Sequence, residues 1–136
     1  MKITADLAQP IVDQVMDVVE YNINIMNEEG IIVASGDRMR LNQTHQGAKE
    51  VIEKKRERVV YPMDADAMVG TKPGVNLPIE FHGSIIGVVG ITGHPGEVYK
   101  TAHIVKITVE ALLQQKYLSD QLYFEQRALE GWVFDL

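Results

Sequence analysis

Two strand-like segments, Gly74–Phe81 and Ser84–Thr92, are separated by only two residues, and this spacing constrains the fold more than any other feature of the sequence. The second segment is rich in β-branched residues, which favour strands. Strands joined by two residues must pair antiparallel, because a parallel crossover needs a dozen or more residues. The second connecting residue is Gly83, which tolerates the positive φ of a tight hairpin turn. The sequence therefore predicts an antiparallel sheet.

The remaining residues show alternating and helical periodicities. Leu7, Ile11, Val15 and Val18 recur at steps of three and four, which predicts an opening helix. Pro78 lacks an N–H group, so its strand is expected to lie at an edge of the sheet or to carry a bulge beside it. The predicted elements before the hairpin are a helix over 4–20, strands over 21–27 and 31–34, a helix capped by residue 42 or 44 that ends near 55, a short strand over 58–61, and a mobile connection over 62–73.

Helical periodicity returns at about residue 97 and continues toward the end of the chain. A first apolar seam is suited to packing on the sheet, and a second continues beyond the reach of a small sheet. We expect this second seam to form a symmetric homodimer, with the opening helix contributing. The first seam consists of Val98, Ala102, Val105, Val109 and Leu112, and the second of Leu118, Leu122, Leu129, Trp132 and Leu136.

The order of the elements lacks a regular βαβ repeat and so predicts an α/β fold of the α+β kind. The architecture resembles the PAS-like sensory fold, in which helices cover a curved antiparallel sheet and enclose a pocket for a small ligand. A chain of 136 residues has room for one hydrophobic core, so we expect a single domain over residues 1–136.

Composition excludes several classes of function. A net charge of −6 is unfavourable for binding nucleic-acid phosphates. The absence of cysteine excludes disulfides, thiolate metal ligands and cysteine nucleophiles. The four histidines have no metal-ligand spacing, and the glycines at 87, 90 and 93 do not form a phosphate loop. We therefore expect no metal and no cofactor. The N-terminus lacks an apolar signal region and no segment is long enough to span a membrane, so a cytoplasmic protein without membrane contact is expected.

The segment from residue 35 to 48 is the first candidate ligand site. Residues 37–58 contain seven Lys or Arg and four Asp or Glu, a local charge of +3 in an acidic chain. Arg38 or Arg40 could hold a carboxylate with two parallel hydrogen bonds, and His45 could donate to another oxygen. The start of the following helix would add backbone N–H groups that stabilise an anion. The alternative is that both arginines point to solvent and that His45 caps the helix. The candidate residues here are Ser35, Arg38, Arg40, His45, Gln46, Gly47 and Ala48.

Asn76 and Leu77, beside Pro78, form a second candidate. The amide of Asn76 offers a donor and an acceptor to a hydroxylated ligand. The alternative is that it only satisfies backbone groups, which is common for asparagine beside glycine. Ser35, Asp37 and His45 also contain the residue types of a hydrolytic triad, but no nucleophile-elbow sequence surrounds the serine.

Five motifs follow one another along the chain: YNINIM at 21–26, SGDR at 35–38, HQGA at 45–48, GVNLP at 74–78 and GVVGITG at 87–93. Together and in this order they resemble the sugar diacid recognition domain of bacterial carbohydrate diacid regulators. The resemblance covers residues 5–117 and implies a sensor for compounds such as glucarate, galactarate and glycerate, with a DNA-binding helix-turn-helix region beyond the C-terminus. The chain departs from the family pattern at Gln46, where glutamate is usual, and at residues 41–42, where Ile-Gly is usual.

These observations predict a non-catalytic sensor. Arg38, with Arg40 or the helix start, is expected to hold a carboxylate, while His45, Ser35 and Asn76 bind hydroxyl groups. The ligand would be a small sugar diacid or hydroxy acid, and its binding would be passed on through the terminal helices. DNA would be bound only through the missing region. Two alternatives remain: a dimerisation module without a small-molecule ligand, and a small hydrolase or isomerase that uses Ser35, Asp37 and His45.

Overall fold

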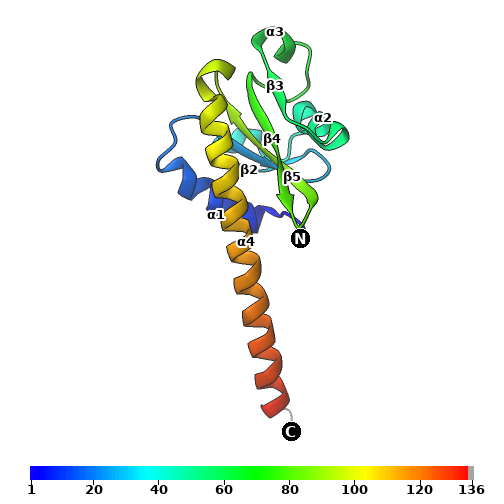
Figure 1. Cartoon of the computed structure of the whole chain (residues 1–136), viewed down its shortest axis with the longest axis vertical. Helices are drawn as coiled ribbons and strands as arrows, with labels where there is room; N and C mark the ends of the chain where they lie inside the picture. Colours follow the sequence, from blue (N-terminus) through cyan, green and yellow to red (C-terminus); the bar gives the residue numbers. More distant parts are fainter. Residues whose placement is uncertain (135–136) are drawn as a thin grey trace.

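One five-stranded antiparallel sheet, with strand order β2-β1-β5-β4-β3, forms the centre of the protein (Figure 1). The computed structural model describes residues 1–134, with side chains described as far as residue 129. The elements are α1 (Ala5–Met16), β1 (Ile23–Met26), β2 (Ile32–Ser35), the 3-10 helix η1 (Arg38–Arg40), α2 (Gln46–Lys54), β3 (Arg58–Val60), α3 (Pro62–Ala65), β4 (Gly74–Phe81), β5 (Ser84–Thr92) and α4 (Pro95–Phe134).

The hairpin of β4 and β5 forms as the sequence predicted. His82 and Gly83 join the strands with φ angles of 50° and 80°, so both turn residues occupy the left-handed region. Such a turn matches the twist of the two strands. The predicted fold class is confirmed.

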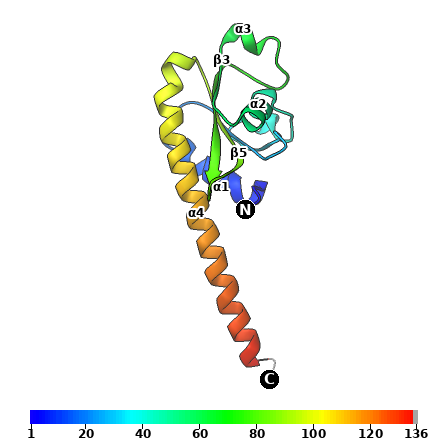
Figure 2. The ribbon, with the colours of Figure 1, turned by 45° about the vertical axis from the view of Figure 1, so that its right-hand side comes forward.

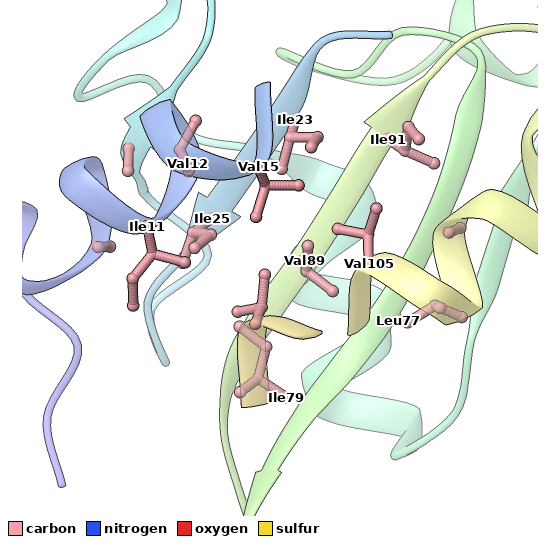
Figure 3. Packing of buried hydrophobic residues seen from close by; sticks show 14 of the residues in the cluster. Ile11, Val12, Val15, Ile23, Ile25, Leu77, Ile79, Val89, Ile91 and Val105 are labelled. Atoms are coloured by element: carbon pink, nitrogen blue, oxygen red, sulfur yellow. The ribbon is translucent and has the colours of Figure 1, made fainter. Parts of the chain in front are cut away.

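Helices cover the two faces of the sheet unequally. α1 and α4 pack on one face, and α2 packs on the other (Figure 2). The core beneath α1 and α4 is built from aliphatic side chains, among them Ile11 and Val15 of α1, Ile25 of β1 and Val105 of α4 (Figure 3). Burying each of these side chains contributes roughly 1.5–3 kcal/mol, so this face holds most of the driving force for folding.

The long helix α4 has an attached half and a projecting half. Val98, Ala102, Val105, Val109 and Leu113 are buried against the sheet. Beyond them the helix continues away from the domain (Figures 1 and 2). Its second seam is exposed at Leu118, Leu122 and Leu129, while the side chain of Trp132 and all of Leu136 lie outside the described residues.

Three elements differ from the sequence-based predictions. α1 ends at Met16 instead of residue 20, and Val18, expected on its apolar stripe, is 84% exposed. The predicted connection over 62–73 contains the short helix α3 and is tied to α2 by hydrogen bonds. The N-cap of α2 is His45, not residue 42 or 44.

The outer edge of β4 is capped by α4. Because β3 pairs only with Gly74–Asn76, the rest of β4 has no strand partner on that side. The Nζ atom of Lys106 donates to the carbonyl oxygen of Pro78 at 2.5 Å, and the carboxylate of Glu110 accepts from the N–H of Glu80 at 2.7 Å. The two side chains also pair with each other at 2.9 Å. The bulge of this hairpin lies between Ile79 and Glu80, shortly after the predicted position at Leu77 and Pro78.

Within the described residues, none of the helices combines the length and the apolar character needed to cross a membrane.

Candidate functional site

The buried polar side chains of the described residues gather on the α2 face of the sheet. Each is at most 8% exposed, whereas the opposite face is filled by aliphatic side chains. Burying a polar group costs free energy unless the group is hydrogen-bonded, so the concentration of these side chains on one face makes that face the candidate site. The six residues are Asn24, Ser35, Arg40, His45, Thr71 and Asn76, and we call them the polar cluster.

Strand register aligns part of the polar cluster in one row across the sheet. Ser35 of β2 pairs with Asn24 of β1, Asn24 pairs with Gly90 of β5, and Gly90 pairs with Asn76 of β4. Directly paired residues of neighbouring strands share a face, so Ser35 lies on the same face as Asn24. The side chain of Asn76 occupies the space over Gly90, because a Cβ atom on Gly90 would lie 2.5 Å from Oδ1 of Asn76.

Arg40 is the buried cation of this face. Its guanidinium donates to the carbonyl oxygen of Gly70 at 2.9 Å and to the hydroxyl of Thr92 at 3.3 Å. Among the described side chains no carboxylate lies within ion-pair distance of it. Burial lowers the pKa of Arg40 below its ordinary value, and the carboxylate of Asp37 partly opposes this shift. An arginine remains charged under these conditions, so the cluster holds a cation without a paired anion.

Arg38, the other predicted carboxylate ligand, is exposed. Both arginines belong to η1, whose start is capped by the carboxylate of Asp37 accepting from the N–H of Met39 at 3.0 Å. A 3-10 helix has three residues per turn, so side chains two positions apart point in different directions. The geometry therefore places Arg40 in the cluster and Arg38 outside it.

His45 is buried, and one of its ring nitrogens is already used. Its Nδ1 atom accepts from the N–H of Ala48 at 2.9 Å, which caps α2 as the alternative interpretation proposed. Burial, together with the nearby charge of Arg40, lowers the pKa of His45 from its ordinary value of 6.5 to about 4. The ring is therefore neutral near pH 7, and its proton lies on Nε2. That N–H is a donor available to an oxygen of a ligand.

The N–H groups at the start of α2 are occupied, contrary to the prediction that they are free to bind an anion. The N–H of Gln46 donates to the carbonyl of Val69 at 3.0 Å, and the N–H of Gly47 donates to the hydroxyl of Thr71 at 3.1 Å. Gln46 also accepts from the N–H of Val69 at 2.9 Å through its side chain. Residues 69–71 thus cover the start of α2, and we call them the covering loop.

Asn76 and Leu77 lie on opposite faces of β4, so they do not form the predicted pair. Leu77 is buried in the apolar core beneath α4, because successive side chains of a strand alternate between faces. Asn76 faces α2, and its Nδ2 atom donates to the backbone carbonyl of Arg58 at 3.3 Å. Its Nδ2 atom also lies 3.3 Å from the position that a Cβ of Gly47 would occupy, so the row and the start of α2 adjoin.

Ser35 is engaged by amides and not by a histidine. Its Oγ atom donates to Oδ1 of Asn24 at 2.5 Å and accepts from the N–H of Asp37 at 3.0 Å. The Nδ1 atom of His45 is occupied by Ala48. A hydrolytic serine requires a base that accepts its proton, and an amide oxygen cannot serve as one. This geometry does not assemble the triad considered for Ser35, Asp37 and His45.

Sequence reasoning missed Asn24, Gly90, Thr71 and Thr92. Asn24 could have been found from the sequence. It is a polar residue between two isoleucines of a strand, so its side chain lies on the face opposite to theirs. Thr71 and Thr92 carry no local signal, since their contacts come from segments far apart in the chain.

The polar cluster is closed, and the cavities described on the surface lie elsewhere. A cavity of about 450 Å³ lies between α1 and α4 and is lined by Leu7, Ile11 and Leu112, among others. Others, of about 330 and 550 Å³, flank the end of α2. The covering loop closes the cluster on the side of α2. A ligand of this site must therefore be small or must displace residues 69–71.

The fold defined by this sheet and its helices is that of PAS-like and GAF sensory domains. A crystal structure of residues 122 to 287 of a methyl-accepting chemotaxis protein superposes with a TM-score of 0.57 and 16% identity, covering 84% of this chain and 90% of that one. The GAF domain of an Acinetobacter phosphoenolpyruvate-protein phosphotransferase gives 0.57 and 10% identity, with 86% of both chains covered. At these identities the likeness concerns the fold alone.

Sequence comparison gives the family. The family described as "Putative sugar diacid recognition" matches residues 3–136, and the chain belongs to it. The carbohydrate diacid regulator of Escherichia coli is 36% identical over 96% of this chain and 34% of its own length. An uncharacterized protein of Haemophilus influenzae is 37% identical over 100% of this chain and 37% of its own length. The chain thus spans about a third of the length of these relatives, and the resemblance inferred from the motifs is confirmed.

Proposed function

We propose that the chain is the cytoplasmic sensor domain of a transcription regulator, and that it binds a small hydroxylated organic acid at the polar cluster. The observation that carries this proposal is the guanidinium of Arg40, which is buried without a carboxylate partner. A buried charge left unpaired is costly, and an anionic ligand would remove that cost. The family of the chain supports the same conclusion, because sugar diacids and related hydroxy acids are anions.

The ligand would be held by groups from three parts of the fold. Its carboxylate would accept from the unused N–H groups of Arg40 and from Nε2 of His45. Its hydroxyl groups would bind Asn76 and the Ser35–Asn24 pair along the row. This assignment retains Ser35, Arg40, His45 and Asn76 from the sequence-based prediction, and it replaces Arg38 by Arg40 as the principal cation.

Signalling would pass from the covering loop and the sheet to α4. A ligand shifts an equilibrium only if it binds one arrangement better than the other. Opening of the covering loop would release the N–H groups of Gln46 and Gly47, and the ligand would compensate for those hydrogen bonds. On the opposite face of the sheet, the projecting half of α4 carries exposed leucines that suit a homodimer. DNA would be bound by a part of the longer protein outside this chain.

Thermal unfolding with added acids tests the proposal. Glycerate, glucarate and galactarate should be assayed separately at millimolar concentration against the full chain. A ligand present at a hundred times its Kd stabilises the folded state by about 2.7 kcal/mol, which raises the Tm by several degrees. Unchanged melting with all three acids, together with a dimer in sedimentation, would favour a dimerisation module without a small-molecule ligand.

Two alanine variants of η1 then identify the cation. We expect Arg40→Ala to lower the affinity for the stabilising acid about 100-fold, because the charged hydrogen bonds to the carboxylate are lost. Arg38→Ala should change the affinity by less than about threefold, because an exposed charge contributes little. The reverse result would restore the sequence-based assignment of Arg38. Mass spectrometry would show whether the bound acid is converted into a product. Absence of turnover would distinguish a sensor from a small enzyme.

A further inference from the structure

The exposed apolar side chains of α4 form one stripe that passes through both halves of the helix. In the attached half, Ile104 and Ile107 are 65% and 66% exposed, although the opposite side of this half is packed on the sheet. Figure 2 shows this half along the outside of the domain. Successive members are three, four or seven residues apart, which keeps them on one side of a helix. The members among the described side chains are Ile104, Ile107, Ala111, Leu118, Leu122 and Leu129, and we call them the α4 stripe.

The α4 stripe extends the predicted second seam onto the domain. The seam begins at Leu118 in the sequence-based prediction, and the structure adds residues 104–111, where α4 is attached to the sheet. Exposed apolar side chains such as Val18 and Met39 lie singly, which is usual on a soluble protein. A contiguous apolar stripe indicates instead a surface that another molecule covers.

The residues on both sides of the α4 stripe are uncharged. Where two identical surfaces meet, like charges come close to each other and oppose binding. The flanks of the stripe avoid this, because charged residues such as Lys116 and Asp120, which pair with each other at 3.1 Å, lie outside the flanking positions of the heptad. The distribution of charge therefore suits a second copy of the same helix. The flanking residues are Leu112, Gln114, Ser119, Gln121, Gln126 and Ala128.

The length of the α4 stripe limits what can cover it. At a rise of 1.5 Å per residue, Ile104 and Leu129 are about 38 Å apart along the helix. A helix that packs along the whole stripe must have a similar length and a matching repeat of apolar residues. Helices α1 and α2 have 12 and 9 residues, whereas α4 has 40. Among the described elements, only the α4 helix of a second copy meets both conditions.

A cavity beside the stripe offers room for such a helix. It has a volume of about 450 Å³ and lies between α1 and α4. Gln115, which lies between Ala111 and Leu118 on the exposed side of α4, lines it together with Leu7 and Pro10 of α1. A second helix placed along the α4 stripe would therefore lie next to α1 and close this cavity.

We propose that the α4 stripe is the interface for the α4 helix of a second copy of this chain, and that the interface includes the attached half of α4. The inference rests on the proposed function, which includes a homodimer, and it names the surface that forms the pair. The attached half is fixed on the sheet through Val98, Val105 and Val109. A partner helix on Ile104 and Ile107 is therefore held at a fixed place relative to the sheet. A pair formed by the projecting half alone would leave the two domains without contact.

Sedimentation equilibrium of the full chain tests this interface through the dissociation constant of the dimer. We expect Ile104→Gln in the attached half and Leu122→Gln in the projecting half each to raise the Kd of the dimer about tenfold or more. Both side chains are exposed in the single chain, so neither change removes a core contact. The matched control is Val18→Gln, at an exposed aliphatic residue outside α4, and it should change the Kd less than about twofold.

The outcomes separate the inference from the proposed function. If Ile104→Gln leaves the Kd unchanged while Leu122→Gln raises it, the attached half is outside the interface. The inference is then overturned, and the homodimer of the proposed function stands. A chain that is monomeric at all concentrations overturns the inference and the homodimer, but not ligand binding, which thermal unfolding with acids measures independently. An equal weakening by Val18→Gln places the partner elsewhere and also overturns the inference.

Glu125 interrupts the α4 stripe between Leu122 and Leu129, and its replacement gives a test in the opposite direction. Glu125→Leu removes a charge from the interface and completes the apolar repeat, so we expect the Kd of the dimer to fall about tenfold or more. Arg127→Leu is the matched control, because it adds an exposed leucine on the same helix outside the stripe. It should change the Kd less than about twofold. Equal tightening by the two variants would mean non-specific association and would contradict the interface.

Discussion

The two faces of the sheet bury side chains of opposite character. Beneath α1 and α4 the strands contribute Ile25, Val89 and their neighbours, whereas beneath α2 they contribute Asn24, Asn76 and a glycine. Successive side chains of a strand point to opposite faces, so adjacent residues can contribute to the apolar core and to the polar cluster. The apolar face stabilises the fold and positions α4. The free energy gained by the apolar face offsets the cost of burying polar groups on the other face. The polar face can therefore hold a buried cation whose hydrogen bonds a ligand would complete.

The largest effect is expected from a cavity on the apolar face. Ile25→Ala should lower the free energy of unfolding by about 3–4 kcal/mol, because Ile25 is fully buried and the space left cannot collapse. Chemical denaturation measures this loss. Asn24→Ala, at the adjacent residue on the polar face, should cost about 1–2 kcal/mol. Similar losses for the two variants would contradict the division of roles between the faces.

Acid should destabilise the polar face through His45. Its pKa is lowered to about 4 in the folded protein from an ordinary value of 6.5, so the unfolded chain binds the proton more tightly. The contribution of the neutral ring is fully present above pH 6.5 and is lost as the pH falls through this range toward 4. The loss should reach about 3 kcal/mol at most.

Denaturation between pH 7.5 and 4 measures the titration of His45. His45→Asn should flatten the dependence on pH, because asparagine retains an N-cap oxygen and does not titrate. The matched control is His94→Asn, at an exposed histidine whose Nδ1 atom accepts from the N–H of Gly96. An equal flattening by the control would assign the pH dependence to other groups.

A smaller effect is expected from the covering loop. Thr71→Val removes the hydroxyl that accepts from Gly47 and donates to Val69, and it should cost about 1–2 kcal/mol. Hydrogen exchange at the amide of Gly47 should accelerate more than exchange in β5. Thr71→Ser keeps the hydroxyl and should retain most of the protection. Uniform acceleration across the sheet would mean that the loop does not open separately.

The smallest effect is expected on the projecting half of α4. Lys116 and Asp120 form an ion pair of 3.1 Å, and both side chains are more than half exposed. Lys116→Ala should change the free energy of unfolding by less than about 0.5 kcal/mol, because exposed pairs contribute little. The measurement is denaturation at low protein concentration. A loss above about 1 kcal/mol would show that this half of the helix is packed in solution.

The sequence was sufficient to predict the hairpin and the long final helix, because both follow from local spacing and periodicity. It also located four members of the polar cluster. Alternation in β4 would have excluded Leu77 from the site had it been applied. The choice between Arg38 and Arg40 depends on the phase of a single 3-10 turn, which local sequence does not determine. The closure of the α2 start by residues 69–71 depends on contacts between distant segments, so periodicity could not predict it.

The capping of β4 by Lys106 and Glu110 has a consequence for assembly. A strand edge with unused backbone groups invites another chain to add a strand, and repeated addition leads to aggregates. Here a carbonyl and an N–H of that edge are occupied by side chains of α4. Self-association by strand addition is thereby disfavoured along this stretch of β4.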